Sequence, residues 1–460
     1  MKSASNRIKI MWIFIALSLA GAAFLLFGII TQGSTWATSS RNAHLYLNGT
    51  LIGAGNITDA DGNILCATKD GSRTFHEDSE VRSALLHVVG DNYGYIASSI
   101  QNQYRTNLSG YNSIMGVWEL SNFEQGSEVN LSVKSAACKA AYEALGGRKG
   151  AVCVYNYKTG AVLVSVSTPT YDPQNIPEDI DDNDAYDGVY INRVNMGLYP
   201  PGSTFKVITA AAAIDSGKGE TEKDFYCDGA YHTSYGDVKC MSEHGSLQMK
   251  EALAKSCNAA FAEIANDVGA DALQKTAESF GYNQKVTLGK LGVYTSTIKA
   301  AKDDALELGW AGIGQSTTLV TPLLQTRIMG AIANGGVPVE PYLVQKVTSA
   351  SGFVQETASA KEGKRALSEE TAREVKSLLR NNFEVQYGDW YFKDGMNPCG
   401  KSGTAETDPD KTPHAWFTGF LDNEQYPYAF AVIVEEGGSG SEVALPVAAQ
   451  VVGALVDSES

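Results

Sequence analysis

The sequence is poor in the residues that several classes of protein depend on. Its 460 residues include 7 cysteines and 6 histidines, and seven cysteines are too few for a disulfide scaffold. The histidines are scattered, without an H-x-x-x-H pattern or a nearby cysteine pair, so we expect no metal site and no cofactor. Basic residues are scarce, because 36 lysines and arginines face 52 acidic residues and leave a net charge of -16. This deficit argues against nucleic acid or anionic lipid as a partner, since both bind basic patches.

The few cysteines differ in their sequence neighbours. Cys227 and Cys240 flank a polar loop that contains glycine, and they are candidates for a disulfide if the domain lies outside the cell. Four others stand in apolar surroundings, which are typical of buried thiols: Cys66, Cys138, Cys153 and Cys257.

Charge is missing altogether from Ile10 to Ile30. A helix of this length reaches about 30 Å, the thickness of one hydrocarbon core. Lys2, Arg7 and Lys9 precede it, and the next basic residue comes well after it. This asymmetry predicts a single-pass membrane protein with residues 1–9 in the cytoplasm and the rest outside. A cleaved signal peptide is the alternative, but its apolar core is shorter, so we expect an uncleaved anchor.

Beyond the membrane segment the sequence divides into a linker and two domains. Residues 31–40 are small and polar, as in a linker. Residues 41–147 resemble a small mixed domain, in which an Asp61-Gly62 turn between short apolar stretches predicts a hairpin. We find no catalytic pattern there and expect a spacer or docking role. Residues 148–460 make up the larger domain.

One stretch organises the larger domain. Pro200-Pro201-Gly202 makes a turn, and Val207–Ile214 behind it is so apolar that it predicts a helix buried on all sides. Ser203 and Lys206 lie in the first turn and share a face. Burial and the positive helix end both lower a lysine pKa, as a base at neutral pH requires, and a serine beside such a base is a candidate nucleophile. An S-x-x-K tetrapeptide also arises by chance, so the rest of the chain must show whether this one is functional.

The remaining pattern mixes helices with a β-rich end. Residues 150–166 predict two strands around a turn, and Leu247–Val268 predicts two helices separated at Ser256-Cys257-Asn258, because serine and asparagine favour caps over helix interiors. Further helices are expected from Thr321 to Gly335 and from Ser368 to Phe383. The C-terminal part predicts strands at 401–404, 414–421 and 428–434, and a closing helix over 445–456.

Three short motifs follow one another along the larger domain: Ser203-x-x-Lys206, Ser256-Cys257-Asn258 and Lys401-Ser402-Gly403-Thr404. In this order and spacing the chain resembles the penicillin-binding proteins and serine β-lactamases, the acyl-serine enzymes. Further stretches resemble the monofunctional (class B) penicillin-binding proteins: residues 171–173, 192–193 ahead of 199–203, 312–315 and 414–417. The resemblance covers about Gly147 to the C-terminus, and it is weaker before that, where the membrane-proximal family pattern is reduced to residues 55–62.

The resemblance implies an α+β fold, with an antiparallel sheet flanked by helices and a helical subdomain that carries Ser256. It also implies a peptidoglycan D,D-transpeptidase that cross-links stem peptides through an acyl-serine intermediate and is acylated by β-lactams. In such an enzyme Ser203 attacks the D-alanyl-D-alanine carbonyl and Lys206 takes its proton. Ser256 relays a proton to the leaving group, and Asn258 holds Lys206 and the substrate amide.

The third motif is expected to bind the substrate. Lys401 supplies positive charge for the substrate carboxylate, with the hydroxyl of Thr404 or Ser402 as a donor, and Gly403 lies between them in the same motif. The backbone N–H groups of Ser203 and Thr404 are expected to form the oxyanion hole. Stem peptides, β-lactams and, through one helix, the plasma membrane are the expected partners, with a membrane glycosyltransferase as a further candidate.

Four other functions compete with this prediction. Residues 395–402 match the phosphate-binding loop G-x-x-x-x-G-K-[ST], but Gly403, Pro409 and Pro413 exclude the helix that such a loop needs. A β-lactam hydrolase needs a base for water, and no glutamate between Asn258 and Lys401 has a matching context. A β-lactam sensor is expected to have several membrane helices. A D,D-carboxypeptidase stays open, because the sequence does not show whether water competes with the amine acceptor.

Overall fold

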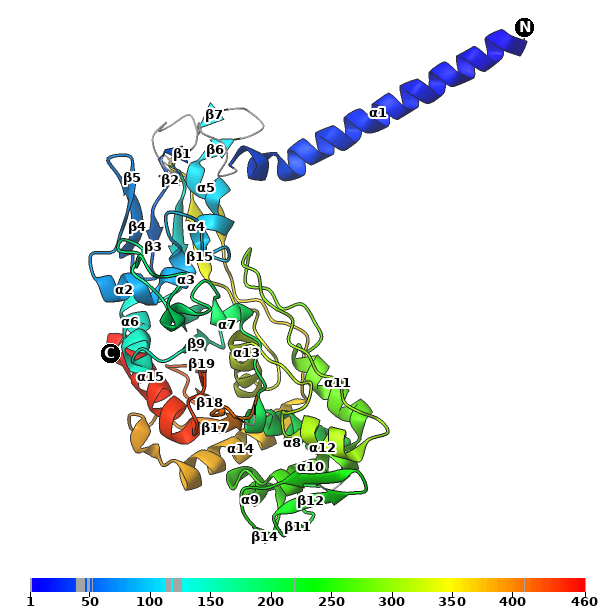
Figure 1. The fold of residues 1–460 in the computed structure, drawn as a ribbon, viewed down its shortest axis with the longest axis vertical. Coiled ribbons are helices and arrows are strands. Elements are labelled where there is room, and N and C mark those ends of the chain that lie inside the picture. Colours follow the sequence, from blue (N-terminus) through cyan, green and yellow to red (C-terminus); the bar gives the residue numbers. More distant parts are fainter. Residues whose placement is uncertain are drawn as a thin grey trace.

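The computed structural model describes residues 2–38, 46–47, 50–51, 53–112, 117–118, 126–218, 220–408 and 410–459. A long N-terminal helix projects from two stacked domains (Figure 1). This helix, α1 (Lys2–Ala37), contains an apolar stretch, Asn6–Gly33, that is long enough to cross a membrane. It continues past the predicted end at Ile30, so most of the expected linker is helical. The end of that linker, at residues 39–40, and the predicted start of the domain at 41 lie outside the described residues.

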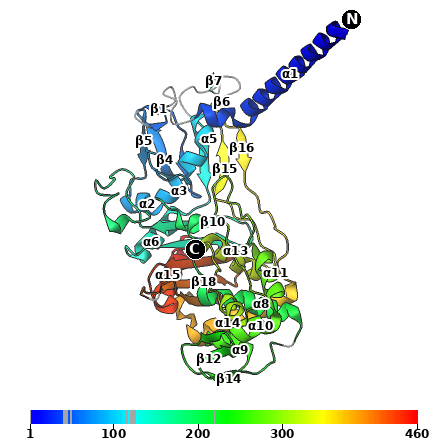
Figure 2. The same cartoon turned by 45° about the vertical axis from the view of Figure 1, so that its right-hand side comes forward.

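The domain next to α1 is built on a mixed sheet with the strand order β16-β15-β8-β3-β4-β5. The N-terminal region supplies β3 (Ile57–Thr58), β4 (Ile64–Lys69), β5 (Ser72–Phe75) and β8 (Glu128–Leu131). The other two strands, β15 (Val344–Thr348) and β16 (Val354–Thr357), come from the second half of the chain (Figure 2). The predicted boundary at 147/148 therefore does not separate the two domains completely, because a distant hairpin completes the first sheet.

The larger domain is centred on a five-stranded antiparallel sheet with the order β10-β9-β19-β18-β17. The strands are β9 (Gly150–Asn156), β10 (Val162–Thr168), β17 (Pro398–Ala405), β18 (His414–Leu421) and β19 (Tyr428–Val434). Every residue of β19 is buried, as its unbroken apolar run predicts. The predicted hairpin at 150–166 and the β-rich C-terminal part are confirmed. The third motif lies on β17, an edge strand whose free edge can pair with an extended ligand.

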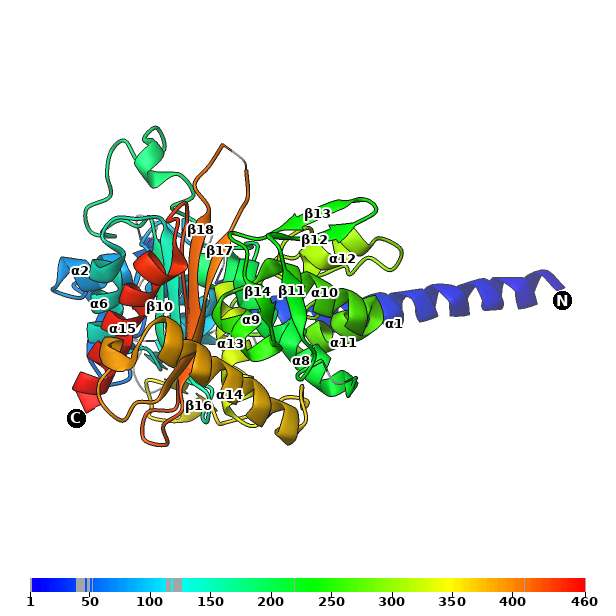
Figure 3. The ribbon, with the colours of Figure 1, turned by 90° about the horizontal axis from the view of Figure 1, so that it is seen from below.

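Helices cover both faces of this sheet (Figure 3). On one face lie α6 (Ser135–Leu145) and α15 (Leu445–Glu459), which contact each other. A stretch that overlaps α15, Gly440–Glu459, is apolar enough to span a membrane, but half of it is buried against this domain. On the other face lie α13 (Pro322–Ala333) and α14 (Glu369–Gln386). The α+β arrangement expected from the sequence is confirmed.

A helical subdomain lies beside the free edge of β17. It contains α8 (Lys206–Ser216), α9 (Met249–Ala254), α10 (Asn258–Val268), α11 (Ala270–Phe280) and α12 (Ala305–Gly312). Four short strands form two hairpin-like pairs on it: β11 (Phe225–Cys227) with β14 (Gly245–Leu247), and β12 (Ala230–Thr233) with β13 (Gly236–Lys239). The expected interruption of the 247–268 segment is present between α9 and α10.

Candidate active site

The nucleophile candidate lies where a tight turn becomes a buried helix. Residues Gly202–Phe205 form a 3-10 turn that runs directly into α8, so Ser203 precedes the helix and Lys206 begins it. Gly202 has φ +54°, and a Cβ there would lie 2.6 Å from the carbonyl oxygen of Thr404. This glycine therefore allows the turn to press against β17. The indole N–H of Trp416 donates to the Pro200 carbonyl at 3.0 Å and ties the turn to β18.

Lys206 is the centre of the site, and its side chain is fully buried. Its Nζ donates to Ser203 Oγ at 3.1 Å, to Asn258 Oδ1 at 2.7 Å and to Ser256 through both the carbonyl oxygen (2.6 Å) and Oγ (3.2 Å). Burial and the nearby charge of Lys401 hold the pKa of Lys206 well below its ordinary value. The geometry therefore places an amine with a lowered pKa within reach of a serine hydroxyl, as a general base requires.

Ser256 and Asn258 reach Lys206 because the chain breaks between α9 and α10. Ser256 has φ +54°, a conformation that few residues other than glycine adopt, and so turns its carbonyl oxygen toward Lys206. Asn258 begins α10, and its side-chain amide donates to the Lys239 carbonyl at 2.9 Å. Because that amide nitrogen is held in this way, the oxygen faces Lys206.

Lys401 extends from β17 toward the same serine. Its Nζ donates to Ser256 Oγ at 3.1 Å and to the Ser402 carbonyl at 2.9 Å. Burial lowers the pKa of Lys401 to about 7. No carboxylate in the described part of the chain forms an ion pair with Lys206 or Lys401. Lys206 of the first motif and Lys401 of the third motif therefore both contact one hydroxyl, Ser256 Oγ.

The other residues of the third motif have different surroundings. Ser402 is occupied by Tyr387, whose hydroxyl donates to Ser402 Oγ at 2.8 Å and accepts from the Ser402 N–H at 2.9 Å. Thr404 is exposed. Gly403 is buried against the nucleophile turn, and a Cβ there would lie 2.9 Å from Thr204 Cγ2. Thr404 is therefore the hydroxyl of this motif that is free to meet a ligand.

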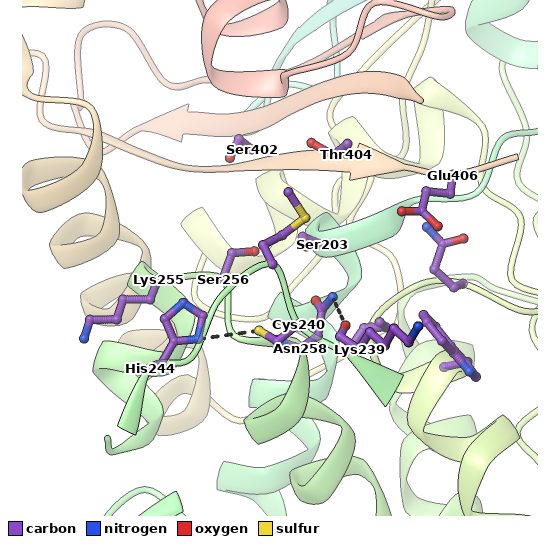
Figure 4. Close-up of a pocket in the computed structure, with 14 residues that line it drawn as sticks. Ser203, Lys239, Cys240, His244, Lys255, Ser256, Asn258, Ser402, Thr404 and Glu406 are labelled. Carbon is purple, nitrogen blue, oxygen red and sulfur yellow. Dashed lines mark hydrogen bonds between the residues drawn. The ribbon is translucent and has the colours of Figure 1, made fainter. Parts of the chain in front are cut away.

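Residues of all three motifs line one cleft of about 360 Å³ between β17 and the helical subdomain (Figure 4). Five predicted residues line it: Ser203, Ser256, Asn258, Ser402 and Thr404. Sequence reasoning did not single out several others, namely Lys239, Met241, Lys255, Trp310 and Glu406. Most of these come from loops without a motif, and only their position in the fold brings them to the cleft.

The predicted disulfide is not present. Cys227 and Cys240 are both free thiols, as are the other five cysteines. Instead, Cys240 Sγ lies 3.5 Å from His244 Nδ1 and 3.9 Å from Cys257 Sγ. The prediction that no cysteine pair lies near a histidine is wrong, because Cys227, Cys240, His244 and Cys257 converge beside the cleft. The spacing Cys240-x-x-x-His244 was the sequence signal for this cluster.

Fold and site together are those of an enzyme that works through a lysine-activated serine. Residues 150–453 match the family model described as penicillin binding protein transpeptidase domain. The chain therefore belongs to the penicillin-binding protein transpeptidase family, and the resemblance seen in the sequence is confirmed.

Relatives with known activity and structure agree with this assignment. The chain is 33% identical over 366 residues to the peptidoglycan D,D-transpeptidase PbpA of Mycobacterium tuberculosis, covering 73% of this chain and 74% of that protein. It resembles the penicillin G acyl-enzyme complex of M. tuberculosis penicillin-binding protein A with a TM-score of 0.77 and 28% identity, over 88% of this chain and all of that one. The D,D-transpeptidase domain from Eggerthella lenta gives a TM-score of 0.76 at 28% identity, over 88% of this chain and 99% of that one.

Proposed function

We propose that this protein is a membrane-anchored peptidoglycan D,D-transpeptidase that works through an acyl intermediate on Ser203. The observation that carries the proposal is the contact of 3.1 Å between Ser203 Oγ and Nζ of the buried Lys206. The site is supported by the three-motif arrangement around one cleft. The named activity of the PbpA relative is in keeping with this chemistry.

Acylation begins with proton transfer from Ser203 to Lys206. The serine oxygen then attacks the carbonyl carbon between the two D-alanines, and the N–H groups of Ser203 and Thr404 stabilise the oxyanion. As the C–N bond breaks, the departing amine receives a proton from Lys206 through Ser256 Oγ, which lies 3.2 Å from Lys206 Nζ. D-Alanine leaves, and the remaining stem peptide is an ester of Ser203.

Transfer of the acyl group repeats these steps in reverse. An amine of a second stem peptide enters the cleft and loses a proton to Lys206 through Ser256 Oγ. Its nitrogen attacks the ester carbonyl, the C–O bond breaks, and Ser203 regains its proton. A β-lactam enters the first half of this cycle, but its departing amine stays tethered and blocks the acceptor.

The donor carboxylate binds to Lys401 and Thr404. Lys401 Nζ lies 3.1 Å from Ser256 Oγ, so a carboxylate there places the scissile bond beside Ser203. The pKa of Lys401 is about 7 in the free protein. An approaching carboxylate raises this pKa, so that Lys401 takes up a proton and becomes positively charged. Ser402 serves through its contact with Tyr387, which holds the strand at the cleft.

The membrane anchor is the apolar stretch of α1, with the N-terminus in the cytoplasm and the catalytic domain outside. Lys2, Arg7 and Lys9 before the span support this orientation. In this position the cleft faces the peptidoglycan layer, and a membrane glycosyltransferase that supplies nascent glycan is the partner we propose.

The test is incubation of the purified full-length protein with uncross-linked pentapeptide strands. A transpeptidase releases D-alanine and forms cross-linked dimers, and Ser203→Ala should lose both products. The matched control is Ser216→Ala, a serine at the end of α8 away from the cleft. D-Alanine release without dimers, under conditions where an added amine is abundant, would favour the D,D-carboxypeptidase alternative instead.

A further inference from the structure

Four side chains with metal-ligating atoms meet beside the cleft, and we call them the Cys3His cluster: Cys227, Cys240, His244 and Cys257. They come from four separate places in the subdomain. Cys227 ends β11, Cys240 follows β13, His244 precedes β14, and Cys257 caps the N-terminus of α10. Their ligand atoms all lie within 4.8 Å of one another. Convergence of three sulfurs and one imidazole on a single point is what a closed metal site requires.

Three distances within the cluster are close to the edges of a tetrahedron around zinc. Zinc–sulfur bonds of about 2.3 Å and zinc–nitrogen bonds of about 2.05 Å give tetrahedral edges of about 3.8 Å between sulfurs and about 3.6 Å between sulfur and nitrogen. His244 Nδ1 lies 3.5 Å from Cys227 Sγ and 3.5 Å from Cys240 Sγ. Cys240 Sγ lies 3.9 Å from Cys257 Sγ. A disulfide instead brings two sulfurs to about 2.05 Å.

Hydrogen bonds from outside the cluster orient its ligands. The backbone N–H of Asn258 donates to Cys240 Sγ at 3.2 Å, and the N–H of Ala260 donates to Cys257 Sγ at 3.5 Å. Such donors stabilise the negative charge of a thiolate. The other ring nitrogen of His244, Nε2, lies 3.2 Å from Ser242 Oγ, so Nδ1 is the nitrogen directed at the sulfurs. A partner on the second nitrogen is the usual support of a metal-bound histidine.

We propose that the Cys3His cluster binds one structural Zn²⁺ ion. The set of three thiolates and one imidazole suits a soft, tetrahedral d¹⁰ ion, and with four protein ligands the site is closed to substrate. On binding, each cysteine that coordinates zinc releases its thiol proton to solvent.

Zinc in this position would fix the second catalytic motif. Cys257 stands between Ser256 and Asn258, and Cys240 follows Lys239, whose carbonyl holds the Asn258 amide at 2.9 Å. Figure 4 shows Cys240 and His244 at the edge of the same cleft as Ser256 and Asn258. The ion therefore ties the β12–β13 hairpin to the segment that positions the two residues around Lys206. None of the four ligands takes part in acyl transfer.

The test is the zinc content of the full-length protein, purified in detergent without chelators and measured by plasma mass spectrometry. We expect about one zinc ion per chain. His244→Ala and Cys227→Ser should lower this content at least tenfold. Cys66→Ser is the matched control, because it removes a buried cysteine outside the cluster, and it should keep the zinc. His244→Cys should also keep it, since a fourth thiolate completes the site.

A cobalt spectrum decides the matter if a variant fails to fold. Wild-type protein stripped of zinc and given Co²⁺ should show thiolate-to-cobalt charge-transfer bands and the visible bands of a tetrahedral site. A spectrum without charge-transfer bands would overturn the proposal. So would wild-type protein that carries no zinc and yields a Cys227–Cys240 disulfide in non-reducing peptide maps, or zinc that stays unchanged in both ligand variants.

Discussion

At the scale of single residues, we propose different tasks for the two buried lysines of the site, Lys206 and Lys401. Lys206 has a lowered pKa and contacts Ser203, whereas Lys401 contacts Ser256 and the carbonyl of Ser402 on β17, the strand that we propose receives the substrate carboxylate. A general base must be deprotonated before it can accept the serine proton, but a partner for a carboxylate needs only positive charge. The same substitution at the two positions therefore separates the roles.

Lys206→Arg should slow acylation by penicillin at least about 100-fold, because a guanidinium stays protonated and cannot act as the base. Lys401→Arg should cost less than about tenfold, because it keeps the charge. In the wild type the acylation rate should fall as the pH falls and Lys206 becomes protonated. Stopped-flow rates for the three proteins across pH provide the measurement. A Lys206→Arg variant that acylates normally while Lys401→Arg is inactive would reverse the assignment.

The lowered pKa of Lys401 also predicts how stability depends on pH. Its pKa is about 7 when folded and 10.5 as the ordinary value, so the unfolded chain binds one more proton between these pH values. The free energy of unfolding therefore rises with pH in this window, by up to about 1.4 kcal/mol per pH unit from this residue. Lys401→Met should show a shallower rise between pH 7 and 10 in denaturant titrations. Identical slopes for the two proteins would contradict the burial of a neutral Lys401.

At the scale of elements, the site depends on the close approach of the nucleophile turn to β17. Gly202 and Gly403 permit that approach, since added Cβ atoms would lie 2.6 Å and 2.9 Å from atoms across the contact. The contact places Ser203 beside β17, the edge strand that we propose binds the substrate. A larger side chain in this contact should therefore slow acylation, whereas the same change at a glycine away from the contact should not.

Gly202→Ala should reduce the acylation rate at least about tenfold and lower stability by about 1–3 kcal/mol, through its positive φ and the contact with Thr404. Gly217→Ala is the matched control: its φ is +62°, but nothing lies within 4 Å of the added Cβ. It should lose about 1 kcal/mol of stability and acylate at the wild-type rate. Thermal unfolding together with acylation kinetics checks both. Equal kinetic effects at the two glycines would refute a specific role for the contact.

Local sequence patterns predicted several elements correctly, namely those that depend on hydrophobic burial or on helix capping within one segment. The buried helix after Ser203, the break at 256–258 and the apolar strand β19 follow from periodicity and capping preferences alone. The joining of β15 and β16 to the N-terminal sheet was not predictable in this way, because strand pairing over more than 200 residues leaves no local signal. The Cys3His cluster was missed for a different reason: only Cys240 and His244 form a local pattern, and the four residues meet only when strands β11–β14 fold against the start of α10.

At the scale of the whole molecule, a buried ion pair joins the two domains. Arg82 of α2 (Ser79–Ala84) makes a bidentate contact with Asp172, at 2.7 and 2.6 Å, and both side chains are largely buried. Asp172 follows β10, so the pair links the catalytic sheet to the membrane-proximal domain. Its loss leaves a buried charge without a partner.

Arg82→Ala should therefore lower the free energy of unfolding by about 2–4 kcal/mol. Lys134→Ala is the control, because its partner Asp61 is half exposed and such pairs contribute less than about 1 kcal/mol. Neither residue touches the cleft, so acylation rates at low temperature should stay unchanged. Calorimetry of the detergent-purified proteins compares them. An Arg82→Ala variant as stable as Lys134→Ala would show that the pair does not hold the domains together.

The central claim is that Ser203 carries the acyl group, and peptide mass spectrometry after penicillin treatment tests it most directly. The full-length wild-type protein should show one long-lived penicilloyl adduct, on the peptide that contains Ser203. The Ser203→Ala protein should show none under the same conditions. An adduct on Ser256 or Ser402, or one that persists in Ser203→Ala, would contradict the account.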